Sequence, residues 1–184
     1  MASTLKINNL DTASGTTITI PTGKQLIGTD TASIYAPGMV VQVAERAGNN
    51  NVSRAATTSS TYVSTNLRVT ITPKFSNSKI IVHCVTTANT NQSTGSGSMI
   101  NYTIYRSIGG SSFANIRTQT NGIGHIYNGN ARTQSSITAE VVDTPNTTSE
   151  VRYDIYMKSN GGTSVEIPAT TTEAATFTAT EIAQ

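Results

Sequence analysis

Residues 151–158 alternate strictly between two kinds of side chain, which is the pattern of a half-buried β-strand. The apolar positions are Val151, Tyr153, Ile155 and Met157, and the polar positions are Arg152, Asp154, Tyr156 and Lys158. Successive side chains of a strand point to opposite faces of the sheet. The pattern therefore predicts that the apolar face packs in a core and that the polar face meets solvent. No stretch of the chain shows helical periodicity, so no helix longer than two turns is expected.

Other runs rich in Val, Ile, Thr and Tyr are separated by Gly-rich turn signals at the spacing of a sandwich. Strands are predicted at residues 39–45, 67–72, 79–88, 98–108, 135–142, 151–158 and 175–182. Parallel α/β folds need crossover helices between their strands, and none is predicted. We therefore predict an all-β fold, an antiparallel β-sandwich that is jelly-roll-like.

The Pro-Gly signal at residues 36–38 divides the chain into an N-terminal arm, 1–38, and a sandwich domain, 39–184. The arm contains short extended β pieces at 5–7, 16–20 and 25–27. Such pieces bury too little apolar area to offset the cost of ordering the backbone, about 1–2 kcal/mol per residue. The arm is therefore expected to pack on a partner surface or on sister chains.

The composition indicates a thin core and an uncharged surface. Charged residues make up 12% of the chain, against about 25% in typical soluble domains. Cys84 is the one cysteine, so no intrachain disulfide can stabilise the fold. A thin core without a disulfide favours an obligate oligomer, and we expect a homotrimer. The 12 Lys and Arg residues are scattered singly, which argues against nucleic-acid binding.

The targeting signals of secreted and membrane proteins are not seen in the sequence. The N-terminus lacks the charged start and apolar run of a secretory signal, and no apolar run of 18 residues follows. We expect a soluble chain that is made in a cytoplasm and is not inserted into a membrane.

Few residues could carry acid–base or nucleophilic chemistry. His83 and His125 are the two histidines, and Cys84 is the thiol. Because His83 and Cys84 are neighbours on a predicted strand, they point to opposite faces and cannot act as a nucleophile–base pair. We expect one of them in the core and the other partly exposed.

No metal or glycosidase signature appears either. Zinc and calcium spacings are absent, and nothing in the sequence selects a pair from the carboxylates Glu140, Asp143 and Glu166. We therefore predict no enzyme activity, no cofactor and no metal. A small hydrolase of cell-wall sugar that uses these carboxylates is the enzymatic alternative.

Seven short segments of the chain carry a resemblance to a known family. They are residues 3–10 (STLKINNL), 16–24 (TTITIPTGK), 35–43 (YAPGMVVQV), 60–63 (STYV), 69–73 (VTITP), 78–82 (SKIIV) and 180–183 (TEIA). These segments resemble recurring segments of bacteriophage tail-fibre proteins, especially those of marine and cyanobacterial phages. The resemblance spans nearly the whole chain, although its motifs are short.

The resemblance implies a structural virion protein that is made in the host bacterial cytoplasm. It implies a trimeric fibre that attaches to other phage tail or capsid proteins by its arm and to a host surface glycan by its distal loops. The apolar residues expected to attach the arm are Leu5, Ile7, Leu10, Ile18, Ile20, Leu26 and Ile27. The alternative is a capsid decoration or cement protein that stabilises the shell.

One predicted loop, residues 124–132, is the strongest candidate for receptor contact. Its candidate residues are His125, Tyr127, Asn128, Asn130 and Arg132. Together with Tyr35, Tyr62 and Phe113 they could form a shallow sugar platform, because Tyr offers a flat apolar face with a polar tip. The alternative is that Tyr127 packs against a neighbouring chain of the trimer.

Overall fold

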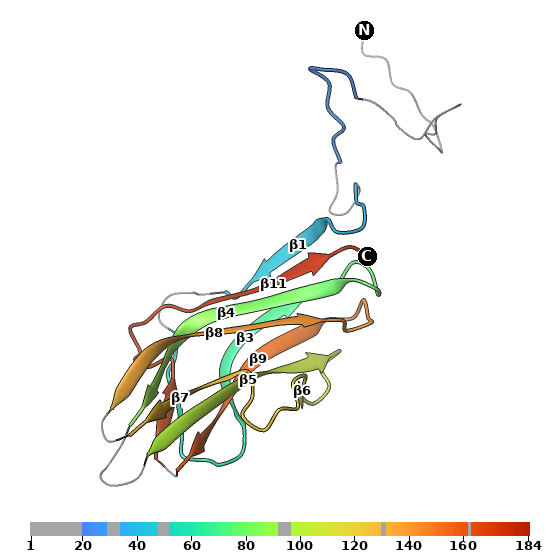
Figure 1. The fold of residues 1–184 in the computed structure, drawn as a ribbon. Coiled ribbons are helices and arrows are strands. Elements are labelled where there is room, and N and C mark those ends of the chain that lie inside the picture. The colour runs from blue at the N-terminus through green and yellow to red at the C-terminus, as the bar shows by residue number, and fades with distance from the viewer. Residues whose placement is uncertain (1–19, 29–33, 48–51, 92–96, 130–131, 162) are drawn as a thin grey trace. The chain divides into compact units, whose positions relative to one another are not determined.

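A computed structural model describes residues 20–28, 34–47, 52–91, 97–129, 132–161 and 163–184 (Figure 1). Contacts between Cα atoms divide the chain into two units, Met1–Ile34 and Tyr35–Gln184. Residues 35–38 thus fall in the second unit, where the Gly38 amide donates a hydrogen bond of 2.8 Å to the Ala183 carbonyl.

All the described regular structure of the second unit is β, and no helix occurs among the described residues. The strands are β1 Val40–Glu45, β2 Ala55–Thr57, β3 Val63–Ile71, β4 Lys79–Thr90, β5 Ser98–Ile108, β6 Ala114–Asn115, β7 Gly124–Asn128, β8 Thr133–Asp143, β9 Val151–Asn160, β10 Val165–Ile167 and β11 Thr176–Ile182. Each strand predicted for residues 39–184 has its counterpart here. The described part of the arm, residues 20–28, contains no strand.

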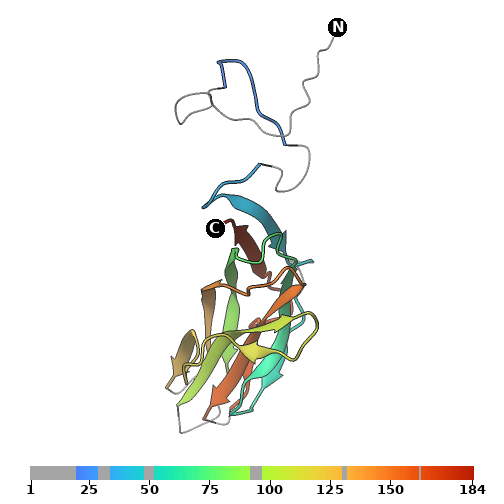
Figure 2. The same ribbon diagram turned by 90° about the vertical axis from the view of Figure 1, so that its right-hand side faces the viewer.

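The strands form two antiparallel sheets that pack face to face (Figures 1 and 2). The first sheet has the order β1-β11-β4-β10-β2, with β8 along the other edge of β4. The second has the order β3-β9-β5-β6, with β7 also paired to β5. The antiparallel sandwich that the sequence predicts is confirmed.

The connections are those of a jelly roll. Without the short strands β2, β6 and β10, eight of the 11 strands remain. We number these eight strands from one to eight along the chain: β1, β3, β4, β5, β7, β8, β9 and β11. Across the first sheet their spatial order is one, eight, three, six, and across the second sheet it is two, seven, four, five. This is the order of a jelly roll, in which two Greek keys wrap into two four-stranded sheets.

The core lies between the sheets, where the predicted apolar row of β9 is confirmed. Val151, Tyr153, Ile155 and Met157 are each 0% exposed. They face residues of the first sheet, among them Ile80, Val82, Cys84, Ala179 and Phe177. The predicted polar face of β9 is wrong at Asp154, which is 0% exposed as well. It is buried because Arg68, on the neighbouring strand β3, folds over its carboxylate.

His83 and Cys84 point to opposite faces of β4, and the prediction that one lies in the core and the other is partly exposed is confirmed. Cys84 is 1% exposed and packs in the core, whereas His83 is partly exposed on the other face of β4. Burial raises the pKa of the Cys84 thiol to about 12, although nearby Arg46 acts in the opposite direction. The thiol is therefore protonated and packs as a small apolar side chain.

Candidate binding site

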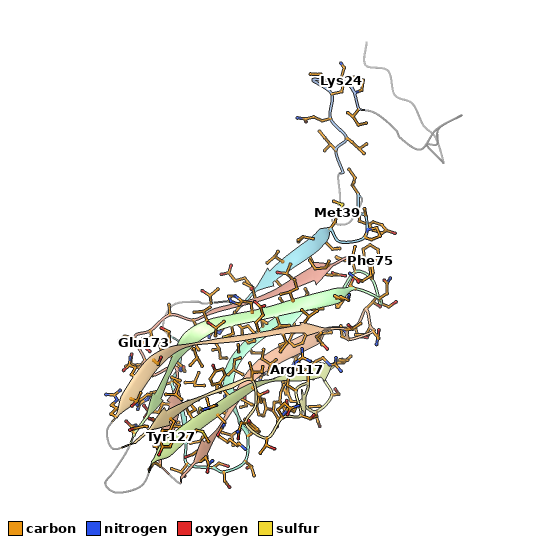
Figure 3. The ribbon with its side chains drawn as sticks, viewed as in Figure 1. Lys24, Met39, Phe75, Arg117, Tyr127 and Glu173 are labelled. Carbon is orange, nitrogen blue, oxygen red and sulfur yellow. The ribbon has the colours of Figure 1, made fainter. Side chains whose placement is uncertain are left out.

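The described part of the arm exposes apolar side chains. Ile20, Leu26 and Ile27 are 44%, 63% and 72% exposed, respectively. A turn lies between them, in which the Lys24 amide donates to the Pro21 carbonyl and Gly23 has φ of 78° (Figure 3). Leu5, Ile7, Leu10 and Ile18 lie outside the described residues.

The predicted receptor loop at 124–132 is wrong over its first half, because residues Gly124–Asn128 form strand β7 and pair with β5. His125 and Tyr127 remain exposed, with Tyr127 at 65%, whereas Asn128 is buried at 3%. Asn130 lies outside the described residues. The structure therefore does not bring the predicted set together on one loop.

Tyr127 lies at the end of the sandwich remote from Met39 and Phe75 (Figure 3). Its ring occupies the space where a side chain of residue 97 would stand, since a Cβ built on Gly97 would come 2.1 Å from the Tyr127 hydroxyl oxygen. Glycine at position 97 therefore lets this ring approach the backbone at the start of β5.

Four other aromatic residues form a column on the outer face of the second sheet. Tyr105 and Tyr156 stack with centroids 3.8 Å apart, Phe113 lies 6.0 Å from Tyr156, and Tyr62 lies 6.1 Å from Tyr105. The sequence singles out Tyr62 and Phe113 but misses the central pair, whose members come from different strands.

The two ends of this column are covered by cations. The Arg68 guanidinium lies 4.8 Å from the Phe113 centroid, and the Lys158 ammonium lies 4.9 Å from the Tyr62 centroid. Sugars stack on ring faces, and neighbouring rings or cations already cover these faces. The column is therefore better suited to packing residues 109–123 against the sheet. Burial, together with the nearby Tyr105, raises the pKa of Tyr62 to about 12, so this hydroxyl stays protonated.

The carboxylates considered for hydrolysis lie in different surroundings. Glu140 is exposed on β8, and Asp143 accepts bonds from Arg106 and Tyr153. Glu166 is 5% exposed on β10, where Asn89, Asn91 and Arg54 surround it. Among the described residues, no group of three or more His, Cys, Asp or Glu could hold a metal ion.

Glu166 is the centre of a polar network that links segments distant in the sequence. Its carboxylate accepts bonds from Asn89 Nδ2 at 2.7 Å and from Asn91 Nδ2 at 2.9 Å. Asn89 Oδ1 in turn accepts from Arg132 Nε at 3.0 Å. Arg132, a predicted receptor residue, therefore helps to order this end of β4.

A trench runs along the side of the sandwich where β1 lies beside β3. It consists of two adjoining depressions of about 280 and 390 Å³, which share Arg46 and Asn66. The first is also lined by Val52, Ser53, Arg54, Ala55 and Thr65, and the second by Glu45, Ala47, Arg68 and Thr70. We call this feature the arginine trench.

Two of the trench arginines are held from behind by buried carboxylates. Arg68 donates to Asp154 Oδ2 from Nη2 at 2.7 Å and from Nε at 3.2 Å. Arg54 Nη1 lies 3.3 Å from Glu166 Oε1. The Arg68 and Arg54 side chains remain 34% and 43% exposed, whereas the side chains of Asp154 and Glu166 are 0% and 6% exposed. Both arginine side chains are thus partly open to solvent while each is paired with a buried carboxylate.

A bulge in β3 places Asn66 between the two depressions. The β3–β9 register shifts between Ser64 and Arg68, and Asn66 has φ of 59°. The Asn66 amide donates to Ser64 Oγ at 3.0 Å, and Asn66 Oδ1 accepts from Arg68 Nη2 at 3.4 Å. Bulges of this kind redirect side chains at sheet edges and beside binding sites. Sequence reasoning misses the trench, because its residues come from separate segments without a motif.

No family model matches the chain, and no curated protein matches it. One solved structure that resembles the fold is that of infectious bursal disease virus, Gx strain, with 13% sequence identity and a TM-score of 0.36. The match covers 86% of this chain and 42% of that chain, so this chain spans less than half the length of the matched one. In the described part of the chain, no helix is long and apolar enough to cross a membrane.

Proposed function

We propose that the chain is a structural protein of a bacteriophage particle, a homotrimeric tail-fibre or receptor-binding protein. The arm joins it to other particle proteins, and the jelly roll faces the host surface. The sequence resemblance to tail-fibre proteins supports this proposal, as does a fold built of strands. The observation that carries it is the exposure of Leu26 and Ile27, at 63% and 72%.

These two side chains suit an attachment segment for a physical reason. Fully burying a Leu or Ile side chain stabilises an assembly by about 1.5–3 kcal/mol. Extended chain without its own sheet can gain backbone partners by adding to the edge of another protein's sheet. The arm thus offers what a docking segment needs, apolar anchors on an extended backbone.

The double variant Leu26→Ser/Ile27→Ser is expected to leave the jelly roll folded and to stop its incorporation into particles. Losing two apolar anchors costs about 3 kcal/mol or more, which lowers incorporation by a factor of roughly a hundred. Quantitative mass spectrometry of purified particles measures the ratio of the variant to the major capsid protein. Val40→Ser, at an apolar position on β1 that is 56% exposed and lies outside the arm, is the matched control and should be incorporated normally. Wild-type incorporation of the double variant would contradict the proposal.

A second candidate function is that of a capsid decoration protein. The outer face of the first sheet exposes Val43, Val85 and Val142 at 61%, 38% and 51%, which suits contact with neighbours in a shell.

Copy number separates the two functions. A tail fibre is expected in tens of copies per particle and a decoration protein in hundreds, because the shell repeats its sites by symmetry. Quantification against the major capsid protein, combined with the mass of the isolated protein in solution, provides the measurement. In both cases a trimer is expected in solution, and a stable monomer would count against both.

A further inference from the structure

We propose that the arginine trench binds an anionic group, a carboxylate or a phosphate, carried by a surface saccharide. The inference rests on the proposed function, because it specifies the chemistry of the receptor that the jelly roll would meet. It places the contact on the β1–β3 side of the sandwich and not on residues 124–132.

The charges that line the trench favour an anion. Three guanidiniums, those of Arg46, Arg54 and Arg68, line its two depressions, together with one carboxylate, Glu45. The carboxylates of Asp154 and Glu166, which pair with Arg68 and Arg54, have side chains that are only 0% and 6% exposed. An approaching ligand therefore meets a surface that is richer in N–H donors than in acceptors.

The arrangement also reduces the cost of binding. Arginine side chains lose rotamer freedom when a ligand immobilises them, about 0.5–1.5 kcal/mol for each side chain. Here Asp154 holds Arg68 through two nitrogen atoms, and Glu166 pairs with Arg54. The planar guanidinium matches the geometry of carboxylate and phosphate oxygens, which can accept two parallel hydrogen bonds from it.

The remaining lining residues favour a saccharide as the carrier of the anion. Ser53, Asn66 and Thr70 provide hydroxyl and amide groups that can exchange hydrogen bonds with sugar hydroxyls. The depressions, of about 280 and 390 Å³, are at the small end of ligand pockets, roughly 300–1,000 Å³. Scattered cations elsewhere on the chain provide no track for a long nucleic acid.

The test uses the full chain and three probes in isothermal titration calorimetry at low salt. Tetragalacturonate supplies carboxylates, poly(glycerol phosphate) supplies phosphates, and maltotetraose is the neutral control. We expect one or both anionic probes to bind, with an affinity that falls as NaCl is raised, and maltotetraose not to bind. Binding of tetragalacturonate alone would assign the site to uronic acids, and binding of the phosphate polymer alone to phosphorylated glycans.

Variants place the binding in the trench. Arg46→Gln and Arg54→Gln are each expected to weaken the binding of the anionic probe at least tenfold. Arg54→Lys keeps the charge but loses the planar fork, and should have an intermediate affinity. Arg117→Gln removes an exposed arginine that donates to the Val142 carbonyl on β8 and does not line the trench, and it should leave the affinity unchanged. A thermal melt of each variant confirms that it is folded.

Three results would overturn the inference: no binding of either anionic probe, equal binding of maltotetraose, or unchanged affinity in both glutamine variants. None of them would affect the proposed role in the particle, which depends on incorporation through the arm. Conversely, normal incorporation of the Leu26→Ser/Ile27→Ser variant would contradict the proposed function, but it would not change the binding of the anionic probes that calorimetry measures on the isolated chain.

Discussion

Ile155→Asp is expected to abolish folding of the jelly roll. Ile155 is 0% exposed and lies on β9, a central strand of the second sheet, where its Cα partner on β5 is Ile104. An ionised carboxylate placed there has no cation to pair with, and burying it costs several kcal/mol in addition to the lost apolar contacts. Single domains are stable by only about 5–15 kcal/mol, and the combined loss is of the same size as that margin.

The measurement is the soluble yield of the variant, followed by circular dichroism and thermal unfolding. Thr138→Asp is the matched control, because it introduces the same side chain on β8 at an exposed position. The control should fold normally. A soluble Ile155→Asp protein with cooperative unfolding would show that this face of β9 is not the core.

Arg68→Met is expected to destabilise the protein by about 3–5 kcal/mol at pH 7, because it leaves a buried charge without its partner. Arg68 is the cation that pairs with Asp154, at 2.7 Å, and Asp154 is 0% exposed. Asp154 Oδ1 already has no hydrogen-bond partner among the described residues. Only Ser64 Oγ, at 2.7 Å from Oδ2, would still donate to the carboxylate.

The loss should depend on pH in a defined direction. Burial raises the pKa of Asp154 in the folded protein, and hydrogen bonds from Ser64 and Arg68 together with the Arg68 charge partly oppose this rise. Without Arg68 the folded-state pKa rises further. A carboxyl whose folded pKa lies above its unfolded pKa destabilises the fold when ionised, and this penalty is relieved as the pH falls through the folded pKa. The difference between Arg68→Met and wild type should therefore shrink from pH 7 towards pH 4.

Urea unfolding of both proteins across this pH range gives the difference in the free energy of unfolding directly.

Another buried carboxylate titrates in the opposite sense. Burial raises the pKa of Glu181, but hydrogen bonds from Ser78, Gln42 and the Lys74 and Phe75 amides outweigh burial and lower it. The stability that Glu181 contributes is lost as the pH falls, but this contribution is common to both proteins and cancels in the difference between them.

In a further variant, Arg68→Met/Asp154→Leu, most of the stability should return, because the buried charge is removed together with its partner. A pH-independent loss, or no recovery, would contradict the assignment.

Amphipathic alternation accounts for how much of the fold could be predicted. Strands such as β5 and β9 bury one face in the core, so their periodicity shows in the sequence, and the predicted bounds of β5 are those observed. The sequence does not predict β7, because its first residue, Gly124, belongs to the Gly122–Gly124 turn signal and the four residues after it read as a continuation of the loop. The sequence does not predict β10 either, because all three of its residues, Glu166 included, are buried, and so short a segment shows no alternation of apolar and polar residues.

The candidate site was harder to predict, because it depends on pairing between distant residues. The alternation in β9 predicts that Asp154 faces solvent, and only the fold shows that Arg68, 86 residues away, covers it. Sequence patterns report which face of a strand a residue occupies. They do not report which cation from another strand lies above that face, and so they could not indicate that Arg68 is fixed in place.

The hydrogen bonds that join residues 38–39 to Ala183 have a further consequence. The Gly38 amide donates to the Ala183 carbonyl at 2.8 Å, and the Ala183 amide donates to the Met39 carbonyl at 3.0 Å. The polypeptide therefore enters and leaves the jelly roll at adjacent points. A domain whose two ends meet can be exchanged as a cassette, or inserted into another protein, without changing the span that its neighbours must bridge. Such a module could pass between otherwise unrelated chains by recombination and keep its fold.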